Sequence, residues 1–116
     1  MEKTAHTAQS SLHISEDVVS TIVDEAIKEL KGIHSLSVLP RHQRMLGASM
    51  ASRPVRISIS GGVAQIDLGV IVNLNYRLKE VCEQAQAAVK DAVQNMTGIT
   101  VSKVNISVLG IHVPEG

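Results

Sequence analysis

The sequence predicts an α+β fold, a two-layer sandwich in which two amphipathic helices pack on one face of a mainly antiparallel sheet of about four strands. The chain has 116 residues, which suffices for one hydrophobic core. Two stretches repeat apolar residues at helical spacing, and the segments between and after them alternate in polarity. We therefore expect one α+β domain over residues 13–116, preceded by a flexible N-terminal tail over residues 1–12, where no apolar periodicity exists.

The first helix is predicted over residues 15–31. Ser15 is a favourable N-cap, and Glu16 and Asp17 place acidic groups at the positive end of the helix dipole. Gly32 is expected to end the helix in a left-handed conformation. The apolar stripe that should face the core consists of Val18, Val19, Ile22, Val23, Ala26, Ile27 and Leu30.

Alternating polarity predicts the strands of the first half. A short strand over residues 33–39, with Leu36 and Val38 on one face, ends at Pro40. A strand over residues 55–60 leads into Gly61-Gly62, a pair typical of a tight hairpin with positive φ. The return strand spans residues 63–74, and its packed face is expected to carry Ile66, Leu68, Val70, Val72 and Leu74.

The second half predicts one long helix and one strand. The helix should span residues 76–95 and end at Gly98, and its stripe consists of Leu78, Val81, Cys82, Ala85, Val89, Ala92, Val93 and Met96. The last strand spans residues 101–113. Its apolar residues change parity between Val108 and Leu109, so we expect a bulge near Gly110.

No residue pattern predicts catalysis, a metal site or a cofactor. Cys82 lies in the apolar stripe, where we expect an unreactive core cysteine. The five histidines show no zinc-ligand spacing, and no nucleophile motif occurs. Tyr76 is the sole aromatic residue, so base-stacking platforms and aromatic cages are excluded. The longest apolar stretch, residues 63–74, contains polar residues and is too short for a transmembrane helix.

The distribution of charge is uneven although the net charge is zero. Between Glu29 and Asp67 there is no acidic residue, while five basic residues occur. Four of them are candidate interaction residues around the loop 40–54: Arg41, Arg44, Arg53 and Arg56. Their guanidinium groups could bind carboxylates, lipid headgroups or phosphates, or they could pair with the acidic face of the first helix or of a neighbouring subunit. The sequence leaves these alternatives open.

Several segments together resemble the alkaline shock protein family of bacterial envelope stress proteins. They are the helix opening at residues 14–18, the hairpin into residues 63–68, the Met96-Thr97-Gly98 turn and the alternating strand over residues 104–108. The resemblance covers residues 14–113. It implies a small cytoplasmic protein without catalytic residues, linked to cell-envelope homeostasis and in some members held near the membrane by a small anchor protein.

Two hypotheses follow. The first is a non-enzymatic, homo-oligomeric envelope-stress adaptor or scaffold, cytoplasmic and brought to the membrane by a protein partner. Self-association is expected through Ile71 and the far face of the last strand. The alternative is a nucleic-acid-binding module that uses the basic segment 41–56 on phosphates.

Overall fold

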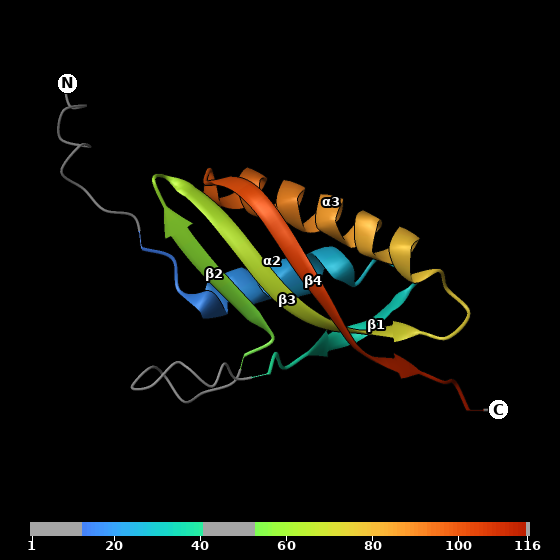
Figure 1. Ribbon diagram of the computed structural model, residues 1–116. Coiled ribbons are helices and arrows are strands. Elements are labelled where there is room, and N and C mark those ends of the chain that lie inside the picture. Colours follow the sequence, from blue (N-terminus) through green and yellow to red (C-terminus); the bar gives the residue numbers. More distant parts are fainter. Residues whose placement is uncertain (1–12, 41–52, 116) are drawn as a thin grey trace, which may run out of the picture.

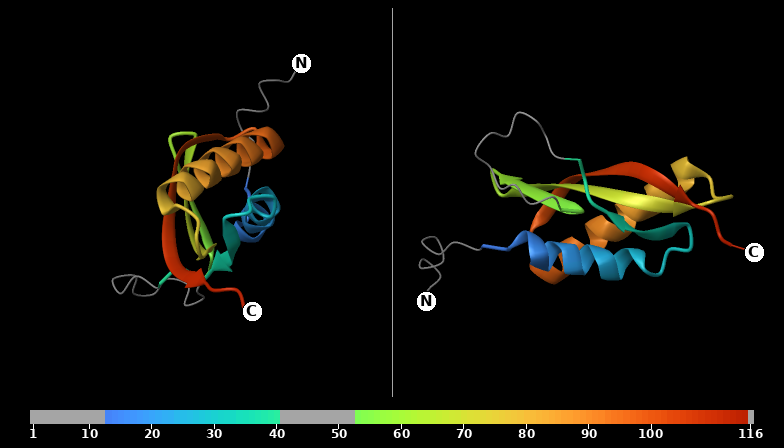
Figure 2. Two further views of the ribbon diagram at one scale, coloured as in Figure 1. Left: turned by 90° about the vertical axis from the view of Figure 1, so that its right-hand side faces the viewer. Right: turned by 90° about the horizontal axis from the view of Figure 1, so that it is seen from below.

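The computed structural model describes residues 13–40 and 53–115. It confirms the predicted fold class, because both helices cover the same face of a four-stranded sheet (Figures 1 and 2). The predicted tail over residues 1–12 lies outside the described residues. In chain order the elements are α2 (Glu16–Ile27), β1 (Ile33–Ser37), β2 (Val55–Ser60), β3 (Val63–Asn73), α3 (Leu78–Thr97) and β4 (Thr100–His112).

Strand β3 is the centre of the sheet. β4 pairs in parallel along its whole length, from Val63↔Thr100 to Asn73↔His112. The opposite edge of β3 is shared by two antiparallel partners, since β2 pairs with residues 63–68 and β1 with residues 69–72. The parallel pair follows from chain order, because α3 carries the chain back to the start of β3 before β4 begins (Figure 1).

Two irregularities in β4 change which residues face the helices. Val70 pairs with Val108 and Ile71 with Gly110, so Leu109 is the extra residue. This confirms the bulge predicted near Gly110. A second register shift leaves Ser102 without a pairing position, and its hydroxyl donates to the carbonyl of Ala64 at 3.1 Å.

The helix ends and the hairpin confirm three predictions and correct one. The Ser15 side chain accepts from the Val18 amide at 3.2 Å, and Gly98 closes α3 with φ 78°. The hairpin glycines have φ 61° and 82°, as the Gly-Gly pair predicts. Helix α2, however, ends at Ile27, and Gly32 does not adopt a positive φ. Tertiary contact explains Gly32 instead: a Cβ there would lie 2.5 Å from Cγ2 of Val81 on α3.

Strand β1 is shorter than predicted, and its packed residue differs. Its register shifts between Ile33 and Ser35, and it ends at Ser37. Val38 is 51% exposed, while Leu39 is buried. The expected pairing of Leu36 with Val38 on one face is therefore wrong, because the strand ends before Val38.

The core lies between the helices and the sheet. Its members are Val19, Ile22, Val23, Ile27, Ile33, Val55, Ala64, Ile66, Leu68, Val70, Val72, Val81, Ala85, Val89, Val93, Val101 and Val104. In α3 the buried residues recur every four positions, so they form one narrow stripe. The apolar residues on either side of this stripe lie at the edge of the core and are only partly covered. Val18, Leu74, Leu78 and Met96 are exposed, and Cys82 is partly exposed, which corrects the expectation that these five face the core.

Candidate functional site

The candidate arginines divide between described and undescribed residues. Arg41 and Arg44 lie outside the described residues. Arg53 precedes β2 and bonds two acids of the first turn of α2: its Nη1 lies 2.6 Å from Oδ1 of Asp17, and its Nε lies 3.2 Å from Oε1 of Glu16. These contacts correspond to the alternative in which the basic segment pairs with the chain's own acidic helix.

Arg56 is also bound within the chain. Its Nη2 donates to the carbonyl of Pro40 at 2.7 Å. The β2–β3 register sets Arg56 opposite Asp67, on the sheet face away from the helices. Arg53 therefore ties the end of the loop 40–54 to α2, and Arg56 ties the start of the loop, at Pro40, to β2. The use of these arginines by a partner stays a prediction.

Lys28, the C-cap residue of α2, pairs with two acids in the later part of the helix. The amine of Lys28 donates to Oε2 of Glu25 at 3.1 Å and lies 3.7 Å from Oδ2 of Asp24. The hydrogen bond and charge of Glu25, with the charge of Asp24, raise the pKa of Lys28 above its usual value. Four acids of the α2 region therefore have basic partners within the chain.

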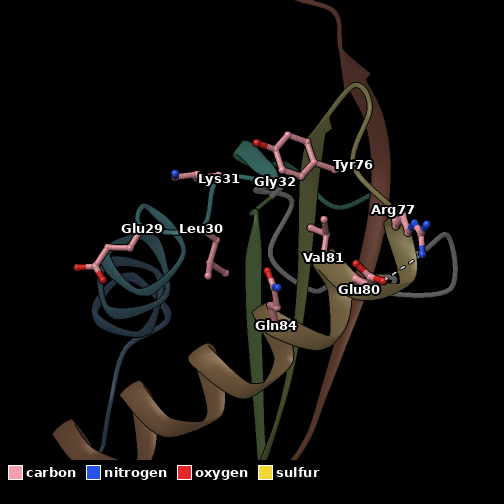
Figure 3. Close-up of a pocket in the computed structure, with 9 residues that line it drawn as sticks. All are labelled: Glu29, Leu30, Lys31, Gly32, Tyr76, Arg77, Glu80, Val81 and Gln84. Atoms are coloured by element: carbon pink, nitrogen blue, oxygen red, sulfur yellow. Dashed lines mark hydrogen bonds and ion pairs between the residues drawn. The ribbon is translucent and has the colours of Figure 1, made fainter.

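A cavity of about 540 Å³ opens where α2 ends and α3 begins (Figure 3). Leu30, Val81 and Gln84 point into the space between the helices, and the Tyr76 ring lies beside Gly32 (Figure 3). The remaining lining side chains, which are charged, are Glu29, Lys31, Arg77 and Glu80. The interior of the cavity is therefore lined by apolar side chains and the Gln84 amide, and its rim carries both charges.

Gly32 and Tyr76 give the cavity its shape. The side chain that glycine lacks would meet Val81 at 2.5 Å and Cδ2 of Tyr76 at 3.2 Å, so the loop after α2 can approach α3 only without a Cβ. Sequence reasoning did not identify this site. The available signal was Tyr76 itself, an isolated aromatic residue just before the second helix.

The sheet face away from the helices is polar around Asp67 of β3, which lies opposite Arg56 of β2 and Asn105 of β4. Asn105 donates from Nδ2 to Oδ1 of Asp67 at 2.7 Å. Near the other end, Leu109 reaches over Gly69, while Ile71 is half-buried. The expected self-association through this face stays a prediction.

Titratable groups do not assemble into a reactive centre in the part of the chain that the structure describes. His34 and His112 stack with ring centroids 3.8 Å apart and link the start of β1 to the end of β4. In residues 13–40 and 53–115, no three His, Cys, Asp or Glu side chains lie close enough together to hold one metal ion. Partial burial raises the pKa of the Cys82 thiol, which lowers the thiolate fraction at neutral pH. None of the described helices is long and apolar enough to cross a membrane.

Comparison with solved structures supports the fold. The chain superposes on two variants of the MamM CTD, one in a zinc form, with TM-scores of 0.54 and 0.56. Sequence identities are 16% and 17%, and the matches cover 86% and 88% of this chain and 87% and 86% of those chains. At this identity the similarity concerns the fold alone.

Sequence comparison identifies the family. The uncharacterized protein YloU of Bacillus subtilis (strain 168) is 27% identical over 111 residues, which are 92% of each chain. The model of the alkaline shock protein 23 family, described as having a cell envelope-related function, matches residues 4–113. This match spans nearly the whole sequence and includes every described helix and strand. The chain belongs to the alkaline shock protein 23 family, whose function is related to the cell envelope.

Proposed function

We propose that this protein is a non-enzymatic adaptor of the cell envelope, which works as an oligomer on the cytoplasmic side of the membrane and reaches it through a protein partner. The observation that carries the proposal is the family match over residues 4–113, with its cell envelope-related function. The family is not a known enzyme family. A small membrane-anchor protein is the kind of partner that we expect.

The described surface supports an adaptor role. The helices cover one face of the sheet (Figure 2). Large apolar side chains remain exposed after β3, at the start of α3 and at the end of β4. Exposed apolar groups that cluster on a small protein are typical of interaction sites. The cavity between α2 and α3 adds concave surface beside them.

The nucleic-acid alternative has less support among the described residues. Arg53 bonds Glu16 and Asp17, and Arg56 bonds the Pro40 carbonyl. A phosphate would have to replace these contacts. The alternative predicts affinity that falls steeply with salt, so binding of a labelled single-stranded oligonucleotide at about 50 and 200 mM salt tests it.

Sedimentation with membranes tests the adaptor proposal. The full chain is mixed with native bacterial membranes, with the same membranes stripped of exposed protein by protease, and with vesicles of the extracted lipids. We expect cosedimentation with native membranes and loss after protease treatment, because the proposed attachment is a protein. Equal binding to bare lipid vesicles, or no binding to native membranes, would contradict the proposal.

A further inference from the structure

Exposed apolar side chains concentrate at one end of the molecule. In the described residues, eleven large hydrophobic side chains are exposed, and five of them form what we call the end patch: Leu74, Tyr76, Leu78, Ile111 and Val113. Each is 42–60% exposed. The two segments that carry them adjoin, because the Leu74 amide donates to the His112 carbonyl at 2.9 Å.

The position of Tyr76 is the strongest single indication that this end binds a protein. The chain has no Phe or Trp, so Tyr76 is its one aromatic side chain. The fold leaves it 45% exposed, although an aromatic ring contributes more to a core than any other side chain. Tyrosine and arginine are, with tryptophan, the residues enriched at the energetic centres of protein interfaces, and Arg77 follows directly.

The cavity continues the end patch, since Tyr76 lines both. Its two walls carry similar charges: the wall after α2 holds Glu29 and Lys31, and the wall at the start of α3 holds Arg77 and Glu80. Each wall thus has one acid and one base. A rim without net charge does not select an acidic or a basic partner, but it matches a copy of itself in which acids face bases.

We propose that the end patch and the adjoining cavity form a two-fold interface with a second copy of this chain. Tyr76 of each protomer packs against the apolar residues of the other, while Glu29 and Lys31 of one protomer meet Lys31 and Glu29 of its partner. This inference deepens the proposed function, because it names the contact through which the adaptor oligomerises.

Mass measurement tests the interface. The full chain is examined by light scattering after size-exclusion chromatography, from about 5 to 200 µM, the range expected for an interface of modest size. We expect twice the 12.4 kDa mass of the chain at high concentration. Tyr76→Asp and Val113→Asp should each give the monomer mass, because each would bury a charged carboxylate in the apolar part of the interface.

Met96→Asp is the matched control. Met96 is 71% exposed and lies at the opposite end of α3, so the same change in polarity should leave the dimer intact. Circular dichroism establishes that each variant is folded. The two end-patch substitutions lie in different segments, between β3 and α3 and after β4, so one folded variant suffices. A monomeric wild type at 200 µM, or a folded end-patch variant that still dimerises, would overturn the inference.

Charge reversal tests the choice of a second copy as the partner. Lys31→Glu and Glu29→Lys should each weaken the dimer about three- to tenfold, because like charges then meet twice across the two-fold axis. An equimolar mixture of the two variants should recover wild-type affinity as a heterodimer, since opposite charges meet again. Unchanged affinity of the single variants, or no recovery in the mixture, would contradict the pairing.

The dimer and the membrane role can fail separately. A Tyr76→Asp monomer that still cosediments with native membranes keeps the adaptor proposal and limits this surface to self-association. A dimer that Tyr76→Asp disrupts, in a protein that binds no membrane, keeps the interface and removes the adaptor role.

Discussion

Replacing Gly32 by alanine is expected to destabilise the protein through a clash with α3. The new Cβ would lie 2.5 Å from Cγ2 and 3.3 Å from Cγ1 of Val81, and 3.2 Å from Cδ2 of Tyr76. Val81 is 4% exposed and packed in the core, so it cannot move aside freely. Overpacking of this kind costs about 1 to 3 kcal/mol.

The physical cause can be isolated with Val81→Ala. This change removes two methyl groups and, with the cavity left behind, costs about 2 kcal/mol by itself. It also removes both Val81 atoms that Gly32→Ala would meet. In the Val81→Ala background only the 3.2 Å approach to Cδ2 of Tyr76 remains, and that side chain is 45% exposed and can shift. Gly32→Ala should therefore cost much less there, which gives a coupling energy of about 1 to 3 kcal/mol between positions 32 and 81.

Gly98→Ala is the control for a purely conformational effect. Gly98 has φ 78° and open space around it, so alanine should cost about 1 to 2 kcal/mol in either background. Urea unfolding followed by circular dichroism measures all six proteins. If Gly32→Ala costs the same with Val81 and with alanine at that position, within about 0.5 kcal/mol, the contact is not the reason for glycine.

Two substitutions and one reactivity measurement test local features. Ser15→Ala should lower the free energy of unfolding by about 1 kcal/mol in urea titration, through loss of the cap on Val18; an unchanged midpoint would contradict this. Arg53→Ala should cost less than about 1 kcal/mol, and the difference from wild type should shrink as salt rises from about 50 to 500 mM, unlike a packing defect. Cys82 should react with a thiol reagent more slowly in the folded than in the urea-unfolded chain at pH 8, with its pH profile displaced to higher pH; equal rates would contradict the raised pKa.

The raised pKa of Cys82 also makes the free energy of unfolding depend on pH, in a direction that can be predicted. A thiol pKa raised by folding stabilises the native state below the unfolded pKa of the thiol. This contribution is lost as pH rises through the native pKa, when the folded state must bear a partly buried thiolate. The effect of Cys82→Ser on unfolding should therefore depend on pH only on the alkaline side.

Local signals predicted the parts of the fold that depend on neighbours in sequence. The Ser15 cap, the Gly61-Gly62 hairpin and the Gly98 helix end are interactions within a few residues. Even the bulge in β4 was visible, because a change in apolar parity requires an extra residue. These features appear in the structure as predicted.

The candidate site could not be predicted in the same way. Residues 29–32 and 76–84 are more than 40 positions apart, and only the packing of α2 beside α3 brings them to one cavity. The partners of Arg53 are likewise 36 and 37 residues away. Neither the cavity nor the ion pairs of Arg53 produce a repeating pattern in the sequence from which they could be predicted.

The sequence alone determined the number and type of elements, the Gly61-Gly62 and Gly98 turns and the family resemblance, because apolar periodicity and capping are local properties of the chain. The tertiary structure alone decided why residue 32 is glycine and where the sole aromatic ring lies. It also decided which apolar residues of α3 and β4 remain exposed. Burial depends on what packs against each position, and that is a property of contacts between distant segments.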